Sequence, residues 1–164
     1  MTSQTISSQA ISRADLRDLY DDYACALDAM RLEDWAAFFT EDARYRVMGR
    51  ETHDQGLSHA TIYCDSGAMI RDRAAAIRET AVFEPRFQRH LISGVQITAT
   101  AADAVESRAN FLIVESMFNA QTRVLLAGEY IDTVIRQADG QLKFTDRLAV
   151  YDTYRIPTTL ILPV

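Results

Sequence analysis

The second half of the chain contains four long stretches in which apolar and polar residues alternate, joined by short turns. This alternation is typical of β-strands, and the Asp139-Gly140 pair between the last two stretches is a strong hairpin signal. The pattern predicts a long antiparallel sheet. Its strands are expected at Phe87–Thr100, Ala104–Phe118, Thr122–Arg136 and Gln141–Tyr154.

The first half of the chain carries helical signals. Ser12 followed by Asp15 is a helix N-cap signature, and apolar residues then recur at helical spacing for about 18 residues. The segment Leu27–Val47 predicts the end of this helix, a short aromatic helix and the start of a strand. Gly67–Thr80 predicts a further helix. Helices followed by hairpin-linked strands favour an α+β fold with the helices on one face of the sheet. The buried side of the last helix is expected to contain Met69, Ile70 and Ile77.

Size and composition are those of an ordinary globular protein. With 164 residues we expect one domain, residues 12–164, after a flexible tail of residues 1–11. The net charge of -6 argues against a nucleic-acid partner. No apolar run reaches the roughly 20 residues needed to cross a bilayer, and the polar N-terminus does not resemble a signal peptide. Cys25 and Cys64 match no disulfide or zinc spacing, which is typical of a cytoplasmic protein.

The strands predict a sheet that is apolar on both faces. In Thr122–Arg136 both alternating sets of residues contain large apolar side chains. A sheet with one face in water normally alternates cleanly between apolar and polar residues. We therefore expect the second face to pack against another subunit. For the last strand, the core face is expected to consist of Leu142, Phe144, Leu148 and Val150.

One group of residues has the composition of a metal site. His53, Asp54 and His59 supply two histidines and a carboxylate, the ligands of a mononuclear iron triad. They fall on a segment expected to be irregular, which would not hold them rigidly. Neither cysteine has a histidine two or three residues away, as a Rieske cluster requires. We interpret the histidines as solvated loop residues and expect no metal in this chain.

His90 is the strongest catalytic candidate. It lies near the start of the first long strand, where it can point into the mouth of the fold. An acid such as Asp28 could then orient it for general acid–base catalysis. The alternative is a histidine held by hydrogen bonds to a neighbouring strand or at an interface, which is the more common situation.

Two further features have structural interpretations. Four carboxylates lie within strands that also carry arginines, and they are expected to form cross-strand or intersubunit ion pairs. The last segment, Ile156–Val164, is largely apolar, so we expect it to dock on its own domain or, with a slight preference, on a neighbour. The carboxylates are Glu129, Asp132, Asp146 and Asp152, and the arginines are Arg89, Arg108, Arg123, Arg147 and Arg155.

Five segments, in this order, resemble a known family, the small (β) subunits of aromatic-ring-hydroxylating oxygenases. The resemblance is greater to the salicylate 5-hydroxylase and terephthalate dioxygenase small subunits than to those of benzoate or anthranilate type. The segments are LDAMRLEDWAAFFTEDARYRV at Leu27–Val47, MIRDRAAAIRET at Met69–Thr80, RFQRHLISGVQI at Arg86–Ile97, AGEYIDTVI at Ala127–Ile135 and RLAVYDTYRIPTTLILPV at Arg147–Val164.

The resemblance implies a cystatin-like cone, as in nuclear transport factor two and scytalone dehydratase, with N-terminal helices on a long curved antiparallel sheet. It also implies an α3β3 hexamer in which the β subunits form a trimer. The catalytic α subunit would carry the Rieske two-iron cluster and the mononuclear iron, and NADH would supply electrons through a reductase. The family assigns the β subunit no catalytic, cofactor-binding or metal-binding residues.

The leading hypothesis is a non-catalytic small subunit that supports a catalytic α subunit. The substrate would be an aromatic carboxylate of the salicylate, terephthalate, benzoate or anthranilate type. The alternative is a free-standing cone-fold dehydratase or isomerase that uses a His90–Asp28 pair. A third hypothesis is a homo-oligomeric module that binds a small aromatic ligand.

Overall fold

The computed structural model describes residues 10–101, 103–157 and 159–164, so most of the predicted tail (residues 1–9) lies outside the described residues. As predicted, all helices precede the four hairpin-linked strands of the second half, and two further strands lie between the helices. The elements are α1 (Arg13–Asp28), α2 (Leu32–Ala37), β1 (Phe39–Gly49), α3 (Arg50–Asp54), β2 (Ile62–Cys64), α4 (Gly67–Glu79), β3 (Arg86–Thr100), β4 (Ala104–Met117), β5 (Arg123–Arg136) and β6 (Leu142–Tyr151).

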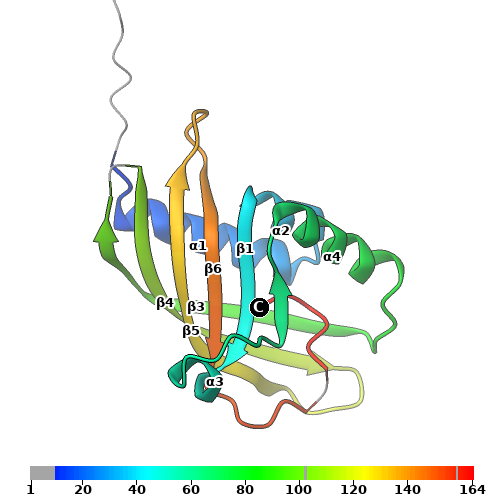
Figure 1. Cartoon of the computed structure of the whole chain (residues 1–164). Helices are drawn as coiled ribbons and strands as arrows, with labels where there is room; N and C mark the ends of the chain where they lie inside the picture. Colours follow the sequence, from blue (N-terminus) through cyan, green and yellow to red (C-terminus); the bar gives the residue numbers. More distant parts are fainter. Residues whose placement is uncertain (1–9, 102, 158) are drawn as a thin grey trace, which may run out of the picture.

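The strands form one sheet in the order β2-β1-β6-β5-β4-β3, as Figure 1 shows. Neighbouring strands are antiparallel, as predicted, except that β1 runs parallel to β6. The two strands are far apart in the sequence, so no hairpin between them imposes an antiparallel direction. The four long strands begin and end within three residues of their predicted positions.

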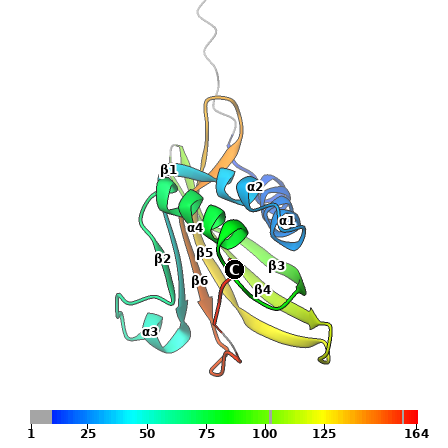
Figure 2. The same cartoon turned by 90° about the vertical axis from the view of Figure 1, so that its right-hand side faces the viewer.

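Three helices cover one face of the sheet. Figure 2 shows α1, α2 and α4 on this inner side and α3 apart from them at one end of the sheet. The predicted cap of α1 is confirmed, because Ser12 and Asp15 exchange hydrogen bonds as a capping box. In α4, Ile70 and Ile77 are buried, but the predicted core residue Met69 is 41% exposed. Met69 lies about 100° around the helix from Ile70 and so faces away from the sheet.

The alternation predicted for β6 is wrong in its second half. A β-bulge at Thr145 adds one residue to β6 opposite β5. One extra residue moves every later side chain to the other face of the sheet. Arg147 and Ala149 therefore point into the core, while Leu148 and Val150 belong to a small separate cluster on the outer face.

The core between the helices and the sheet is rich in aromatic rings, most of them in edge-to-face contact. Such pairs add to the stabilisation that burial of the rings provides. None of the helices in the described ranges is both long and apolar enough to cross a membrane. The central rings are Tyr20, Tyr23, Trp35, Phe39, Tyr45, Phe111, Tyr130 and Phe144.

Candidate functional site

The C-terminal segment docks on its own domain, with residues 162–164 buried inside the cone, so the slight preference for a neighbour was wrong. Val164 is only 1% exposed. Its carbonyl oxygen accepts hydrogen bonds from the hydroxyls of Tyr23 (2.8 Å) and Tyr45 (3.3 Å), and its N–H donates to Tyr45 at 2.8 Å. Figure 2 shows this end of the chain between α4 and the strands. The tyrosine hydroxyls satisfy the polar main chain that the segment brings into the interior.

The segment leaves almost no open space in the cone. The residual cavity, of about 10 Å³, is lined by Phe83, Gln88, Ile113 and the segment itself. A space of this size holds one water molecule at most. This space is therefore too small for an aromatic substrate in this conformation.

The structure brings the predicted pair His90 and Asp28 together. Nδ1 of His90 is 2.7 Å from Oδ1 of Asp28, and the His90 main-chain N–H donates to the same carboxylate at 3.0 Å. The His90 side chain is 1% exposed, and its Nε2 has no hydrogen-bond partner within the described part of the chain. The pair fastens the end of α1 to β3, and this structural role is favoured over the dehydratase alternative.

The β-bulge places a charged pair in the centre of the core. Nη1 of Arg147 donates to Asp132 at 3.0 Å, and both side chains are fully buried. The guanidinium carbon lies 3.9 Å from the ring centre of Tyr23 and 3.8 Å from that of Tyr130, so cation–π attraction replaces part of its lost hydration. Tyr20 donates to Asp132 at 2.5 Å. Burial raises the pKa of Asp132 to about 6, although the charge of Arg147 acts to lower it.

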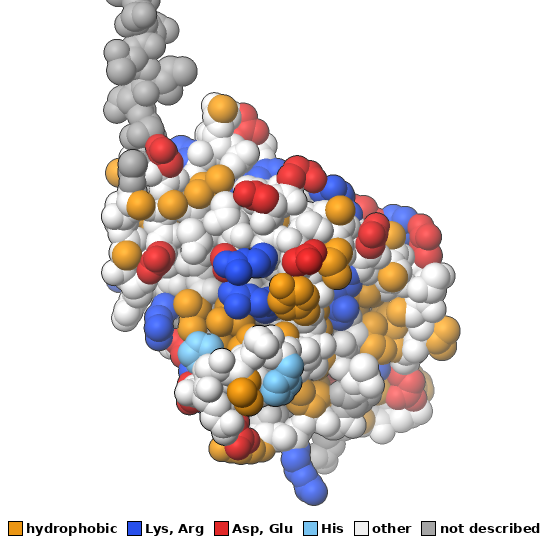
Figure 3. Space-filling view, in the orientation of Figure 1, with side chains coloured by type: hydrophobic (Ala, Val, Ile, Leu, Met, Phe, Trp, Pro, Cys, Tyr) orange, Lys and Arg blue, Asp and Glu red, His pale blue; other side chains and the backbone are white. Residues whose placement is uncertain are grey.

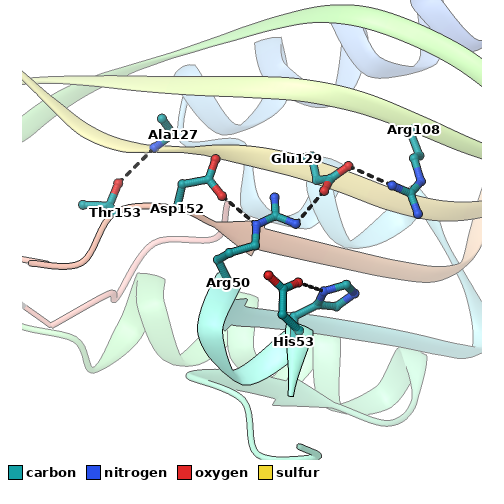
Figure 4. A network of polar contacts seen from close by, with 8 residues as sticks. Arg50, His53, Arg108, Ala127, Glu129, Asp152 and Thr153 are labelled. Atoms are coloured by element: carbon teal, nitrogen blue, oxygen red, sulfur yellow. Dashed lines mark hydrogen bonds and ion pairs between the residues drawn. The ribbon is translucent and has the colours of Figure 1, made fainter. Parts of the chain in front are cut away.

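The carboxylates on the outer face form ion pairs, as predicted, but mostly with other arginines. Figure 4 shows Arg50 of α3 between Glu129 (2.7 Å) and Asp152 (2.8 Å), and Arg108 bound to Glu129 at 3.3 Å. Asp146 binds two arginines of β1. Sequence reasoning missed the arginines of β1 and α3 because the parallel β1–β6 pairing that brings them here has no local signal.

The predicted histidine group does not form a metal site. His53 contacts Asp54 at 3.0 Å, beside the ion pairs of Figure 4, whereas His59 lies 3.4 Å from Thr52. In residues 10–164 without 102 and 158, no three His, Cys, Asp or Glu side chains are placed to hold a metal ion. His53, Asp54 and His59, as the structure describes them, therefore do not fit an iron centre.

One end of the outer face is apolar and exposed. Phe87 is 72% exposed, Leu91 52% and Val124 56%. Cross-strand pairing places Leu112 and Val114 beside them on the same face, and we call these five residues the outer-face patch. Figure 3 shows the middle of this face, where arginines and carboxylates lie beside hydrophobic side chains. An apolar area bordered by charges is typical of a protein–protein interface.

Comparison with known proteins gives consistent matches. The family described as ring hydroxylating beta subunit matches residues 23–158. The chain is 35% identical to the anthranilate 1,2-dioxygenase small subunit of Burkholderia cepacia (89% of this chain, 90% of that protein). It is 32% identical to a terephthalate 1,2-dioxygenase terminal oxygenase component subunit beta 2 from a Comamonas species (87% and 92%). The expectation that anthranilate-type subunits are more distant than terephthalate-type subunits was therefore wrong.

A solved structure has the same fold. It is the β subunit of a putative aromatic-ring-hydroxylating dioxygenase from Novosphingobium aromaticivorans, with a TM-score of 0.84 and 35% sequence identity over 93% of this chain and 96% of that chain. The cone predicted from the sequence is confirmed by this similarity.

Proposed function

Because the chain belongs to the ring-hydroxylating beta subunit family, we propose that it is the non-catalytic small subunit of a multicomponent aromatic-ring-hydroxylating oxygenase. Its work is to support and orient a catalytic alpha subunit. The space beside the C-terminal segment, about 10 Å³, is too small for a substrate, which favours this role over catalysis inside the cone.

The outer-face patch is the observation that carries the proposal. Phe87 and Leu91 are large and exposed. When a partner covers them, burial of their apolar surface stabilises the complex by about 25 cal/mol for each Å² buried. The neighbouring Arg and carboxylate side chains supply the polar rim that aligns the partner. An apolar patch with a charged rim is the arrangement expected of a surface that binds another subunit.

Membership of the family supports finer assignments, which we also propose. We propose an α3β3 assembly in which the small subunits form a trimer. Residues 12–164 form one domain, and the protein is located in the cytoplasm. The Rieske cluster and the mononuclear iron belong on the alpha subunit, with electrons from NADH through a reductase. The substrate proposed is an aromatic carboxylate, since the relatives are named for anthranilate and terephthalate.

The test is assembly with the alpha subunit. Leu91→Arg places a charge in the outer-face patch, and Met69→Arg is the matched control on α4, on the helical side, at similar exposure. After co-expression with the alpha subunit of the same oxygenase, native mass spectrometry and iron analysis measure the complex. We expect Leu91→Arg to weaken assembly at least tenfold, about 1.4 kcal/mol, and Met69→Arg to leave it unchanged.

The two variants should unfold at nearly the same temperature, because both positions are exposed. Full assembly of Leu91→Arg with the alpha subunit would contradict the assigned surface. Turnover of an aromatic substrate by the isolated chain would contradict the non-catalytic role.

A further inference from the structure

Two tyrosine hydroxyls converge on one oxygen inside the cone. Tyr23 and Tyr45 both reach the carbonyl oxygen of Val164, at 2.8 and 3.3 Å. Burial raises the pKa of both tyrosines, so the hydroxyls keep their protons and remain donors. Two buried donors directed at one point favour a carbonyl or carboxylate oxygen over an apolar group.

The same part of the interior contains N–H groups without an acceptor. Nε1 of Trp35, and Nε and Nη2 of Arg147, are buried and have no hydrogen-bond partner among the residues the structure describes. Both side chains lie beside the two tyrosines. The guanidinium carbon of Arg147 is 3.9 Å from the ring centre of Tyr23, and the ring centre of Trp35 is 5.4 Å from that of Tyr45. Trp and Arg side chains only donate, and Asp132 uses only Nη1 of Arg147. These unpaired donors therefore favour an anionic acceptor at this place in the interior.

Aromatic as well as aliphatic side chains surround Leu162 and Val164. The rings of Trp35, Phe39 and Tyr45 contact one another edge to face, and Leu162 and Val164 belong to the same buried cluster. An apolar cavity of about 150 Å³ accepts benzene. Departure of the Leu162 and Val164 side chains would open a space of that order, large enough for one aromatic ring.

We propose that the interior of the cone is a binding site for a small aromatic carboxylate, which residues 160–164 fill in competition with the ligand. The carboxylate would replace the Val164 carbonyl at Tyr23 and Tyr45, and its ring would replace the Leu162 and Val164 side chains. Arg147 binds Asp132 through Nη1, and its Nε and Nη2 would be the donors that remain for the carboxylate. The site belongs to this chain alone, so it does not depend on the assembly proposed above.

Arg73 of α4 provides a means to loosen the segment without removing a hydrogen-bond donor of the site. Its Nη2 donates to the carbonyl oxygen of Ile161 at 2.8 Å and lies 3.5 Å from that of Leu160. The Arg73→Gln change removes a charged donor and so weakens the hold on the segment. Arg71→Gln is the matched control, because Arg71 on the same helix binds Glu41 instead.

The experiment titrates the full chain with benzoate and measures binding by calorimetry and ligand-detected NMR. We expect Arg73→Gln to bind benzoate at least tenfold more tightly than the wild type or Arg71→Gln. Adding Tyr23→Phe to Arg73→Gln should weaken binding several-fold, because the ligand loses a charge-assisted hydrogen bond whereas the competing Val164 carbonyl loses only a neutral one. Toluene, which has the ring without the carboxylate, should bind at least tenfold more weakly than benzoate.

Three results would overturn the proposal: equal benzoate affinity in wild type, Arg73→Gln and Arg71→Gln, no effect of Tyr23→Phe, or toluene binding as tightly as benzoate. Circular dichroism checks that each variant folds. If Arg73→Gln does not fold, Leu162→Ala shrinks the occupant instead, and the same comparisons with wild type decide. Because no alpha subunit is present, failure here is separate from failure of assembly.

Discussion

Replacing Arg147 with methionine should make the stability of the protein depend on pH in a way that the wild type does not. The substitution leaves Asp132 buried without its cation. In the wild type the pKa of Asp132 is already raised to about 6 by burial. Without the charge of Arg147, which lowers it, the pKa must rise further.

The sign follows from proton binding. The pKa of Asp132 is about 6 in the folded wild type and about 3.9 in an unfolded chain. In the folded state Asp132 therefore keeps its proton up to a higher pH than in the unfolded chain. Its contribution to the free energy of unfolding falls as the pH rises from about 3.9 to about 6. Above pH 6 the wild type loses nothing more from Asp132. The variant continues to lose about 1.4 kcal/mol per pH unit until its own higher pKa is reached.

The expected difference in unfolding free energy between wild type and Arg147→Met thus grows by up to about 3 kcal/mol between pH 6 and pH 8. At pH 8 the total should reach the roughly 3–5 kcal/mol that removal of one partner from a buried ion pair costs. Urea unfolding followed by the fluorescence of Trp35, the single tryptophan and fully buried, measures this at several pH values.

Two controls isolate the cause. Adding Asp132→Asn to Arg147→Met should abolish the extra pH dependence, because the titrating group is gone. Arg44→Met removes an arginine whose side chain is 55% exposed and should cost less than about 1 kcal/mol at every pH. A constant free-energy difference between pH 6 and pH 8, or a pH dependence that survives in the double variant, would refute the reasoning.

Three smaller predictions concern single positions. Gly128→Ala should lower the free energy of unfolding in urea by about 1–3 kcal/mol or more, because the added Cβ would overlap a main-chain oxygen of β6. Ser12→Ala should lower the unfolding free energy by about 1 kcal/mol, since the capping box with Asp15 is lost. With a thiol reagent, exposed Cys25 should react at once and Cys64 only after unfolding, because burial shields Cys64 and raises its pKa. Two equally fast thiols would contradict the packing around β2.

Features with a local signal were predictable from the sequence. The Ser12 cap of α1 depends on residues three positions apart, and the long strands depend on alternation and short turns. The parallel partnership of β1 with β6 depends on contacts between residues about a hundred positions apart, such as Arg44 and Asp146. No window of the sequence contains that information.

The candidate site was predictable only in part. The pairing of His90 with Asp28 follows from their expected places in the fold and is confirmed. The bulge at Thr145 was not foreseen, because neither Gly nor Pro marks it, and the predicted faces of Leu148 and Val150 were wrong as a result. The sequence did not determine where the C-terminal segment docks, because an apolar segment can be buried equally well in a groove of its own domain or of a neighbour.

The buried pair of Arg147 and Asp132 connects the interior of the cone with its outer surface. A slip of β6 by one residue against β5 would carry Arg147 to the outer face and leave Asp132 buried without a cation, which costs several kcal/mol. The pair therefore fixes the register that places Asp146 and Asp152 on the outer face, opposite the arginines of β1 and α3. A fixed register is useful in a subunit that binds a partner through one surface, because the buried pair then determines which side chains lie on that surface.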